Sequence, residues 1–91
     1  MDNMDEMVLK EVAAEIAEAR EEHGDYNSAH EAYAVIKEEL EEFWDIVKMK
    51  TAKRSASAMK KELVQIACTA IRAVNDLALH KGLNHECAGR E

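Results

Sequence analysis

Residues 28–47 read SAHEAYAVIKEELEEFWDIV, and the spacing of their apolar side chains predicts an amphipathic α-helix. At about 100° per residue, apolar positions three and four apart gather on one stripe, which is typical of a helix that faces a hydrophobic core. The stripe consists of Ala29, Tyr33, Ile36, Leu40, Phe43, Trp44 and Val47. We therefore expect Tyr33 and Trp44 to pack in the core, the alternative being that they stack on a base. Ser28, with Glu31 three residues later, forms a capping box that predicts where the helix begins.

The acidic residues of this helix fall into two groups. Glu38 lies opposite the apolar stripe, where charged side chains are normally solvated. Glu39 and Glu42 lie instead on a flank whose other members are Ala32, Val35 and Ile46. Two carboxylates one turn apart among aliphatic side chains are costly unless a cation pairs with them. That cation is either a divalent metal ion or a basic side chain of a neighbouring element.

The remaining sequence also predicts helices, because it contains no proline and only three glycines. A first helix is expected from about Asp5 to Glu22, with Met7, Val8, Val12, Ile16 and Ala19 on its apolar face. Residues 23–27 break the helical pattern, and Gly24 can take the left-handed conformation that ends a helix. A third helix is expected from about Ser55 to Lys81, capped by Ser55 or Ser57 and ended by Gly82.

The third helix is apolar over more than half its circumference, and its polar side chains form one row. The row consists of Glu62, Gln65, Thr69, Arg72, Asp76 and His80. A polar row on a buried helix faces hydrogen-bonding partners on other helices, or a metal or ligand. In an antiparallel hairpin that turns near Lys53, Glu39 and Glu42 face the turns that carry Glu62 and Gln65. Three acids and an amide then converge, and such oxygen ligands suit Mg²⁺, or alternatively Mn²⁺.

The spacing of these residues resembles the compact type of MazG-like all-α NTP pyrophosphohydrolases common in phages and bacteria. Glu38, Glu39 and Glu42 match the EExxE motif, and Glu62 matches the Glu of ExxD, whereas Gln65 stands where Asp is expected. The resemblance covers about residues 24–77 and implies a single helical domain over residues 1–82. It also implies Mg²⁺-dependent hydrolysis of a nucleoside triphosphate to the monophosphate and pyrophosphate. The metal ligands are then Glu38, Glu39, Glu42, Glu62 and Gln65, with Glu39 or Glu42 as the catalytic base.

Four further residues are candidates for substrate binding. Half of the twelve basic residues lie between Lys48 and Lys61, and Lys61, which lies beside the polar row, is expected to contact phosphate. Arg72 and Asp76, four residues apart, either pair with each other or reach the substrate or a neighbouring subunit. His30 and the loop at 23–28 either line a nucleoside pocket or form a loop held by its own cap.

Two function classes remain open from the sequence. Three helices cannot cover all apolar residues of the third helix, which predicts a homodimer or homotetramer. The expected fold is therefore all-α, an antiparallel bundle of about three long helices completed by homo-oligomerisation. The first function is the nucleoside triphosphate pyrophosphohydrolase. The alternative is a non-catalytic helical oligomerisation or interaction protein, which the neutral Gln65 favours.

Composition restricts the other possibilities. A chain of 91 residues corresponds to one domain, and its net charge of −7 argues against a nucleic-acid partner. No apolar run is long enough to cross a membrane, and the acidic start lacks a signal peptide's apolar core, so a cytoplasmic location is expected. Cys68 is expected to be buried and reduced. Residues 83–91 are expected to form a disordered tail, and His80, His85 and Cys87 match no strong zinc pattern.

Overall fold

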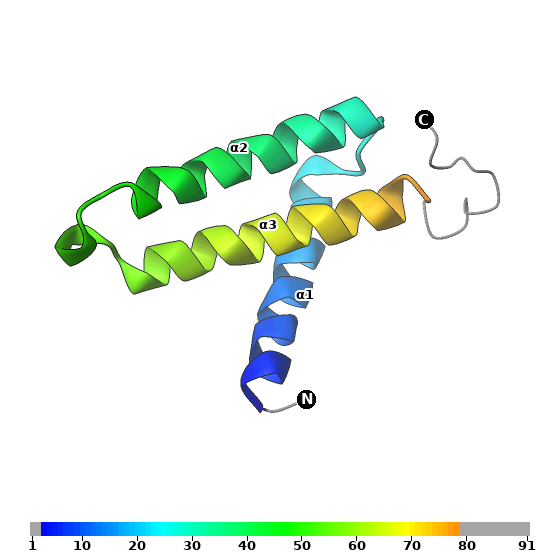
Figure 1. The fold of residues 1–91 in the computed structure, drawn as a ribbon. Helices are drawn as coiled ribbons and strands as arrows, with labels where there is room; N and C mark the ends of the chain where they lie inside the picture. Colours follow the sequence, from blue (N-terminus) through cyan, green and yellow to red (C-terminus); the bar gives the residue numbers. More distant parts are fainter. Residues whose placement is uncertain (1–2, 79–91) are drawn as a thin grey trace.

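The computed structural model describes residues 3–78, which form three α-helices joined by short connections (Figure 1). Helix α1 spans Asn3–His23, α2 spans Ala29–Val47, and α3 spans Ala56–Asp76, with a short 3₁₀ helix η1 at Thr51–Lys53 between α2 and α3. There is no strand within residues 3–78, so the predicted all-α class is confirmed. The other predicted features of the tail, including His80, His85 and Cys87, lie outside the described residues.

The break between α1 and α2 has the predicted chemistry. Gly24 takes a φ of 75°, and its N–H donates to the Arg20 carbonyl at 3.1 Å, which closes the last turn of α1. The Ser28 hydroxyl accepts from the Glu31 N–H at 3.0 Å, as expected of an N-cap. The Glu31 carboxylate accepts from the Asn27 N–H at 2.6 Å, one residue before the cap itself. The Ser28 and Glu31 side chains thus each satisfy a backbone N–H group at the start of α2.

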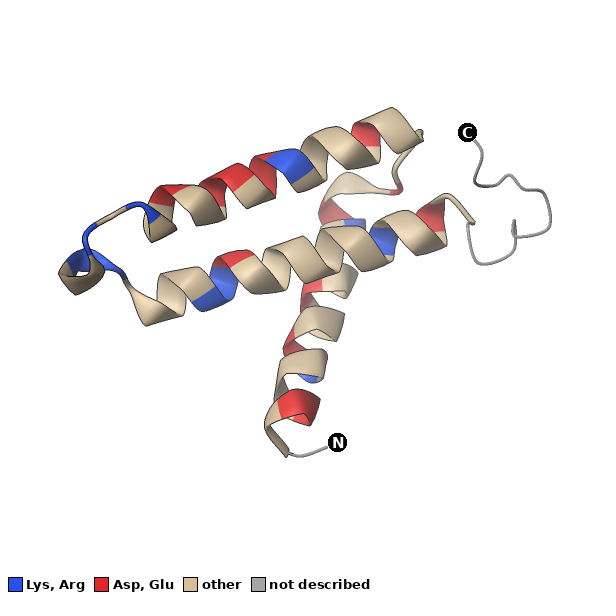
Figure 2. Ribbon diagram, viewed as in Figure 1, with Lys and Arg blue, Asp and Glu red and all other residues tan. Residues whose placement is uncertain are grey.

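The connection between α2 and α3 is basic and neutralises the end of α2. Figure 2 shows Lys and Arg residues, in blue, gathered along this connection. Arg54 donates to the Val47 carbonyl through Nε at 3.0 Å and Nη2 at 2.7 Å, which satisfies an orphan carbonyl at the negative helix end. The Ser55 hydroxyl accepts from the Ala58 N–H at 3.1 Å, so Ser55 and not Ser57 is the N-cap of α3.

Helix α3 is shorter than the sequence predicts. It ends at Asp76, well before Gly82, and Leu77 is its C-cap. Ala78 takes a φ of 57°, a left-handed conformation that costs about 1–2 kcal/mol for a residue with a Cβ. The local pattern offers no glycine at this position. The helix ends instead where the Asp76 carboxylate makes tertiary contacts. These contacts cannot be predicted from the local sequence.

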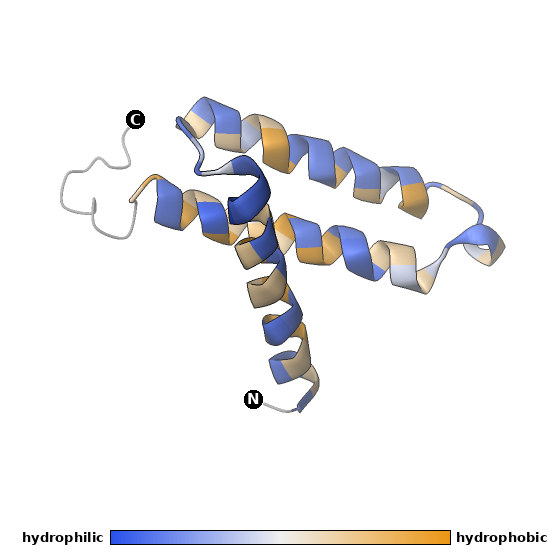
Figure 3. Cartoon of the chain, turned by 180° about the vertical axis from the view of Figure 1, so that it is seen from behind, coloured by the Kyte–Doolittle hydropathy of each residue, from blue (hydrophilic) through white to orange (hydrophobic). Residues whose placement is uncertain are grey.

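Helices α2 and α3 form the predicted antiparallel hairpin, and α1 crosses it. Both views show α2 and α3 side by side, whereas α1 runs steeply across α3 (Figures 1 and 3). The antiparallel arrangement therefore holds for the hairpin, while α1 is not a third parallel member of a bundle. A cavity between the three helices is lined by side chains from each of them.

Much of the apolar stripe of α2 is exposed, which contradicts its expected place in the core, whereas its members Ile36, Phe43 and Val47 are half-buried. Tyr33 is 64% exposed, Leu40 54% and Trp44 56%, so the prediction that Tyr33 and Trp44 pack in the core is wrong for this chain. The flank of α2 that carries Ala32 and Val35 faces the interior instead. Ala32 is buried, and it packs with Val35 against α3. The period of the pattern identified the two faces, but packing decided which face is inside.

The interior of the chain is small and formed by side chains of modest size. The buried hydrophobic residues are Val12, Tyr26, Ala32, Val64, Cys68 and Ala73. Cys68 is a free thiol, as predicted, and burial raises its pKa. Helix α3 also carries exposed apolar residues, which are Leu63, Ile71 and Val74. No helix in the described range is long and apolar enough to span a bilayer.

Candidate metal centre

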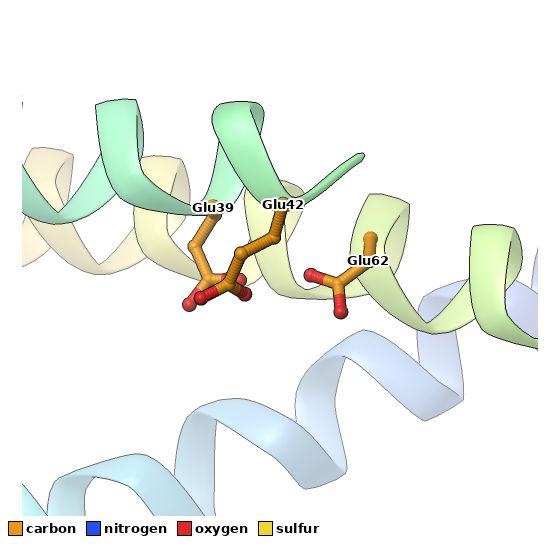
Figure 4. A group of neighbouring side chains, drawn as sticks. All are labelled: Glu39, Glu42 and Glu62. Carbon is orange, nitrogen blue, oxygen red and sulfur yellow. The ribbon is translucent and has the colours of Figure 1, made fainter. Parts of the chain in front are cut away.

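Three carboxylates from two helices meet on the hairpin. Glu39 and Glu42 come from α2 and Glu62 from α3, and one carboxylate oxygen from each lies within 4.8 Å of the others. Figure 4 shows the three side chains directed toward the same point, in the space between the hairpin and α1. The structure thus brings together three of the five residues that the sequence proposes as metal ligands.

Helix geometry explains this convergence. Glu39 and Glu42 are three residues apart on α2, on the same flank as the Ala32 and Val35 side chains that pack on α3. Glu62 lies in the second turn of α3, which runs in the opposite direction. Packing of the hairpin therefore forces these acids to face each other. Glu39 and Glu62 are partly buried and Glu42 is exposed.

The three acids have no basic partner in the described part of the chain. Burial, followed by the Glu42 charge and by close contact with the Glu62 carboxyl, raises the pKa of Glu39 from 4.5 to about 7. No Lys, Arg or His within residues 3–78 forms an ion pair with any of the three acids. Glu62 Oε1 is buried without a hydrogen-bond partner. The basic partner that the sequence left open is therefore not found in the described part of the chain.

The structure places Glu38 apart from this cluster. It is exposed, and it lines a cavity of about 290 Å³ between α2 and the loop that joins α1 to α2. The reason is geometric, since Glu38 lies about 100° around α2 from Glu39. Glu39 lines the same cavity from its edge. We therefore do not retain the prediction that Glu38 is a metal ligand.

The Gln65 side chain reaches α1 and not the three acids. Its Nε2 donates to Glu15 Oε1 at 2.6 Å, and both residues, with Glu39, line a cavity of about 280 Å³ between the three helices. Gln65 was expected to point at the centre formed by Glu39, Glu42 and Glu62. Helix α1 crosses the hairpin at this point and brings the Glu15 carboxylate to Gln65. The Gln65 amide can donate to that carboxylate, and so its side chain turns toward α1.

Sequence reasoning missed the acids of α1. Glu15, Glu18 and Glu22 line the same three-helix cavity. They follow Glu11 at intervals of four, three and four residues, which places the whole row on one helix face. That spacing was a usable signal, although rows of exposed acids are common on solvated helices. Glu11 itself forms an ion pair with Lys60 at 2.9 Å.

Arg72 holds the loop between α1 and α2. It is only 4% exposed, and its Nη2 donates to the Gly24 carbonyl at 2.7 Å. Its Nη1 lies 3.3 Å from the Tyr26 hydroxyl, and its guanidinium stacks at 4.4 Å from the centroid of the Tyr26 ring. The Nε–H is buried without an acceptor. Arg72 does not pair with Asp76, as one sequence-based alternative proposed.

Asp76 fixes the same loop from the next turn of α3. Its side chain is 2% exposed and accepts from Arg20 Nη2 at 2.5 Å and from the Tyr26 N–H at 3.0 Å. Its charge is therefore used within the chain, which removes the basis for a direct contact with substrate. Burial of Tyr26, which raises the pKa of its hydroxyl, was not predicted from the sequence.

The other two candidate substrate contacts are exposed. Lys61 lines a cavity of about 430 Å³ between α1 and α3, together with Lys60 and Gln65. Contact of Lys61 with phosphate stays a prediction. His30 lies on the first turn of α2 and is not among the residues that line these cavities.

No model of a known protein family, no curated protein and no solved structure matches this chain. The likeness to MazG-like enzymes consequently rests on the acidic motifs themselves. The site must be interpreted from its own geometry and charge.

Proposed function

We propose that this chain is a Mg²⁺-dependent nucleoside triphosphate pyrophosphohydrolase, which hydrolyses a triphosphate to the monophosphate and pyrophosphate. The observation that carries the proposal is the meeting of Glu39, Glu42 and Glu62 without a counterion in the described residues. Three carboxylate oxygens are hard ligands, which suit Mg²⁺ or Mn²⁺ better than zinc. The orphaned Glu62 Oε1 fits the same interpretation, because a cation would satisfy it.

The residues divide the chemical task between them. Glu39, Glu42 and Glu62 would hold Mg²⁺, which when bound neutralises charge on the triphosphate and lowers the pKa of water. Glu39 or Glu42 would act as the general base through a carboxylate oxygen that does not hold the metal ion, and would orient the attacking water. Lys61, which lines the 430 Å³ cavity, would contact phosphate.

A second candidate function is a non-catalytic helical oligomerisation module. The exposed apolar side chains of α2 and α3, including Leu40, Trp44 and Ile71, favour it. Such a face calls for a second copy of the chain, as a homodimer or homotetramer. The same surface is compatible with an enzyme that works as an oligomer. Light scattering on the wild type and on Trp44→Ser tests the assembly, and a folded wild-type monomer at micromolar concentration would contradict it.

Release of pyrophosphate from a panel of dNTPs and NTPs, with Mg²⁺ and with EDTA, tests the enzymatic proposal. We expect Mg²⁺-dependent release and a rise in melting temperature when Mg²⁺ is added. Absence of both effects would leave the oligomerisation module as the function. A melting-temperature rise without turnover would identify a metal-binding protein that is not this hydrolase.

A further inference from the structure

The hairpin of α2 and α3 has two broad faces, and α1 crosses only one of them. Figure 3 shows α1 in front of the hairpin. The cavity between the three helices lies on that side, and it is lined by Val35 and Glu39 of α2 and by Gln65 and Arg72 of α3, among others. No element within residues 3–78 covers the opposite face of the hairpin.

Large apolar side chains lie on the uncovered face of both helices. On α2, Leu40 lies roughly 100° around the helix axis from Glu39. On α3, Leu63 lies roughly 160° from Gln65, so it points away from α1. Six large apolar side chains that are 45–64% exposed form this surface, here termed the apolar face. They are Tyr33, Leu40, Trp44, Leu63, Ile71 and Val74.

The apolar side chains of α2 are spaced symmetrically about Leu40. The intervals are three, four, four and three residues, over Tyr33, Ile36, Leu40, Trp44 and Val47. Two copies of α2 that pair antiparallel about Leu40 would therefore bring Ile36 level with Trp44, and Leu40 level with itself. A two-fold interface requires such reciprocal contacts, in which residue i meets residue j and j meets i. The spacing therefore favours a second copy of this chain as the partner.

The area of the apolar face is sufficient for a dimer. From their exposed fractions, the six side chains leave on the order of 600 Å² uncovered on each copy, against about 800 Å² per partner in a standard stable interface. Polar side chains at the edge of the contact would add the remainder. A monomer rarely exposes an apolar patch of this size.

The charges at the edge of the face indicate how two hairpins would pair. Lys37 and Glu41 form an ion pair on the flank of α2 beside the apolar stripe. In antiparallel pairing about Leu40, the partner's Glu41 lies roughly 3 Å along the axis from Lys37, so each lysine meets a carboxylate of both copies. Placing α2 on α3 of the second copy would instead bring Lys48 close to the partner's Lys60. Charge therefore favours α2 on α2.

We propose that two copies of this chain pair through the apolar face in a two-fold dimer, with α2 antiparallel to the α2 of its partner and the axis beside Leu40. The two hairpins then form a four-helix core, and each α1 lies on the outside. Because the acidic cluster opens toward α1, each candidate metal centre stays within one chain. The proposal specifies the assembly of the second candidate function and rests on that function, and it stands whether or not nucleotides are hydrolysed.

Disulfide crosslinking tests the register of this dimer. Facing Cα atoms of helices packed 8–10 Å apart are separated by roughly 4–6 Å, which a disulfide spans. We use a Cys87→Ser background, which leaves only the buried Cys68. On oxidation, Leu40→Cys should convert most chains to covalent dimers. The matched control Ala34→Cys, exposed on another side of α2, should convert almost none. Ile36→Cys and Trp44→Cys should crosslink when mixed and not alone.

Sedimentation of Leu40→Lys provides a second measurement. Leu40 is 54% exposed in the single chain, so the substitution should preserve helix content in circular dichroism. Two lysines would meet at the axis, and we expect folded monomers where the wild type is dimeric. Ala34→Lys should stay dimeric. If Leu40→Lys fails to fold, crosslinking of the milder Leu40→Cys decides the question.

The outcomes separate the register from oligomerisation itself. A folded wild-type monomer at micromolar concentration would overturn both. A wild-type dimer in which Leu40→Cys crosslinks no better than Ala34→Cys, or in which Leu40→Lys stays dimeric, overturns this arrangement alone. Crosslinking that requires a mixture of Leu40→Cys and Ala67→Cys chains does so as well, because it would place α2 on the partner's α3.

Discussion

Two groups of charged side chains lie a few turns apart on the hairpin, and they are built in opposite ways. At the loop end, Asp76 meets Arg20 and a backbone N–H, so a nearly inaccessible carboxylate has its partners. At the acidic cluster, Glu39, Glu42 and Glu62 meet with no cation from residues 3–78. The paired group stabilises the fold, whereas the unpaired group raises the free energy of the folded chain. Under the proposed function, a bound cation would supply the missing charge.

The strongest test of this contrast is removal of a cluster acid, with turnover as the measurement. Glu42→Gln should lower pyrophosphate release by at least about a thousandfold, or roughly 4 kcal/mol in activation free energy, because a ligand to the cation is lost. Glu41→Gln, on the same helix but outside the cluster, should retain the wild-type rate. Full activity in Glu42→Gln would eliminate the metal centre.

Substitutions at the loop end should lower the free energy of unfolding. Asp76→Ala leaves Arg20 and the Tyr26 N–H without their acceptor, and we expect a loss of about 3 kcal/mol in the free energy of unfolding. Asp25→Ala removes an exposed partner of the same arginine, 3.8 Å away, and should cost less than about 0.5 kcal/mol. Urea denaturation of both variants measures the difference. Equal effects would mean that the Asp76 contacts do not stabilise the fold.

Substitution of an acid in the cluster should raise the free energy of unfolding, the opposite of the effect expected at the loop end. Without metal, Glu39→Gln should increase the free energy of unfolding by on the order of 1 kcal/mol at pH 8, because it relieves like-charge repulsion. The folded pKa of Glu39 is about 7, above its ordinary 4.5, so the folded chain holds a proton that the unfolded chain loses between these values. The stability of the wild type relative to Glu39→Gln should therefore fall as pH rises through this window.

Mg²⁺ provides the control for that experiment. A cation bound by the carboxylates replaces the proton, so the wild type should recover stability at pH 8 when Mg²⁺ is added, whereas Glu39→Gln should recover less. A stability difference between the two proteins that does not change from pH 5 to 8 would show that Glu39 titrates normally.

The smallest effect concerns the contact between α1 and the hairpin. Gln65→Asp replaces a donor with a carboxylate opposite Glu15, and we expect a loss of about 1 kcal/mol of stability. Combining it with Glu15→Gln should restore most of that loss, since an amide again faces a carboxylate. A double-mutant cycle by urea denaturation measures the coupling. Strictly additive effects would contradict the Glu15–Gln65 hydrogen bond.

The sequence by itself determined the helices and much of the acidic cluster. Serine caps at 28 and 55 and the glycine at 24 act on their immediate neighbours, so their effects could be predicted from the local sequence. The convergence of Glu39, Glu42 and Glu62 also followed, because a hairpin with a short turn fixes which helical turns are level. Both inferences depend on distances along the chain or across one turn.

Only the tertiary structure decided which helix faces were used. The period of α2 gave two stripes, and the flank of Ala32 and Val35, not that of Tyr33 and Trp44, packs on α3. The crossing of α1 brought Glu15 to Gln65, and the loop brought Tyr26 to Arg72. Helical periodicity fixes which side chains share a face. It carries no information about which face of another helix, some fifty residues away, will meet them.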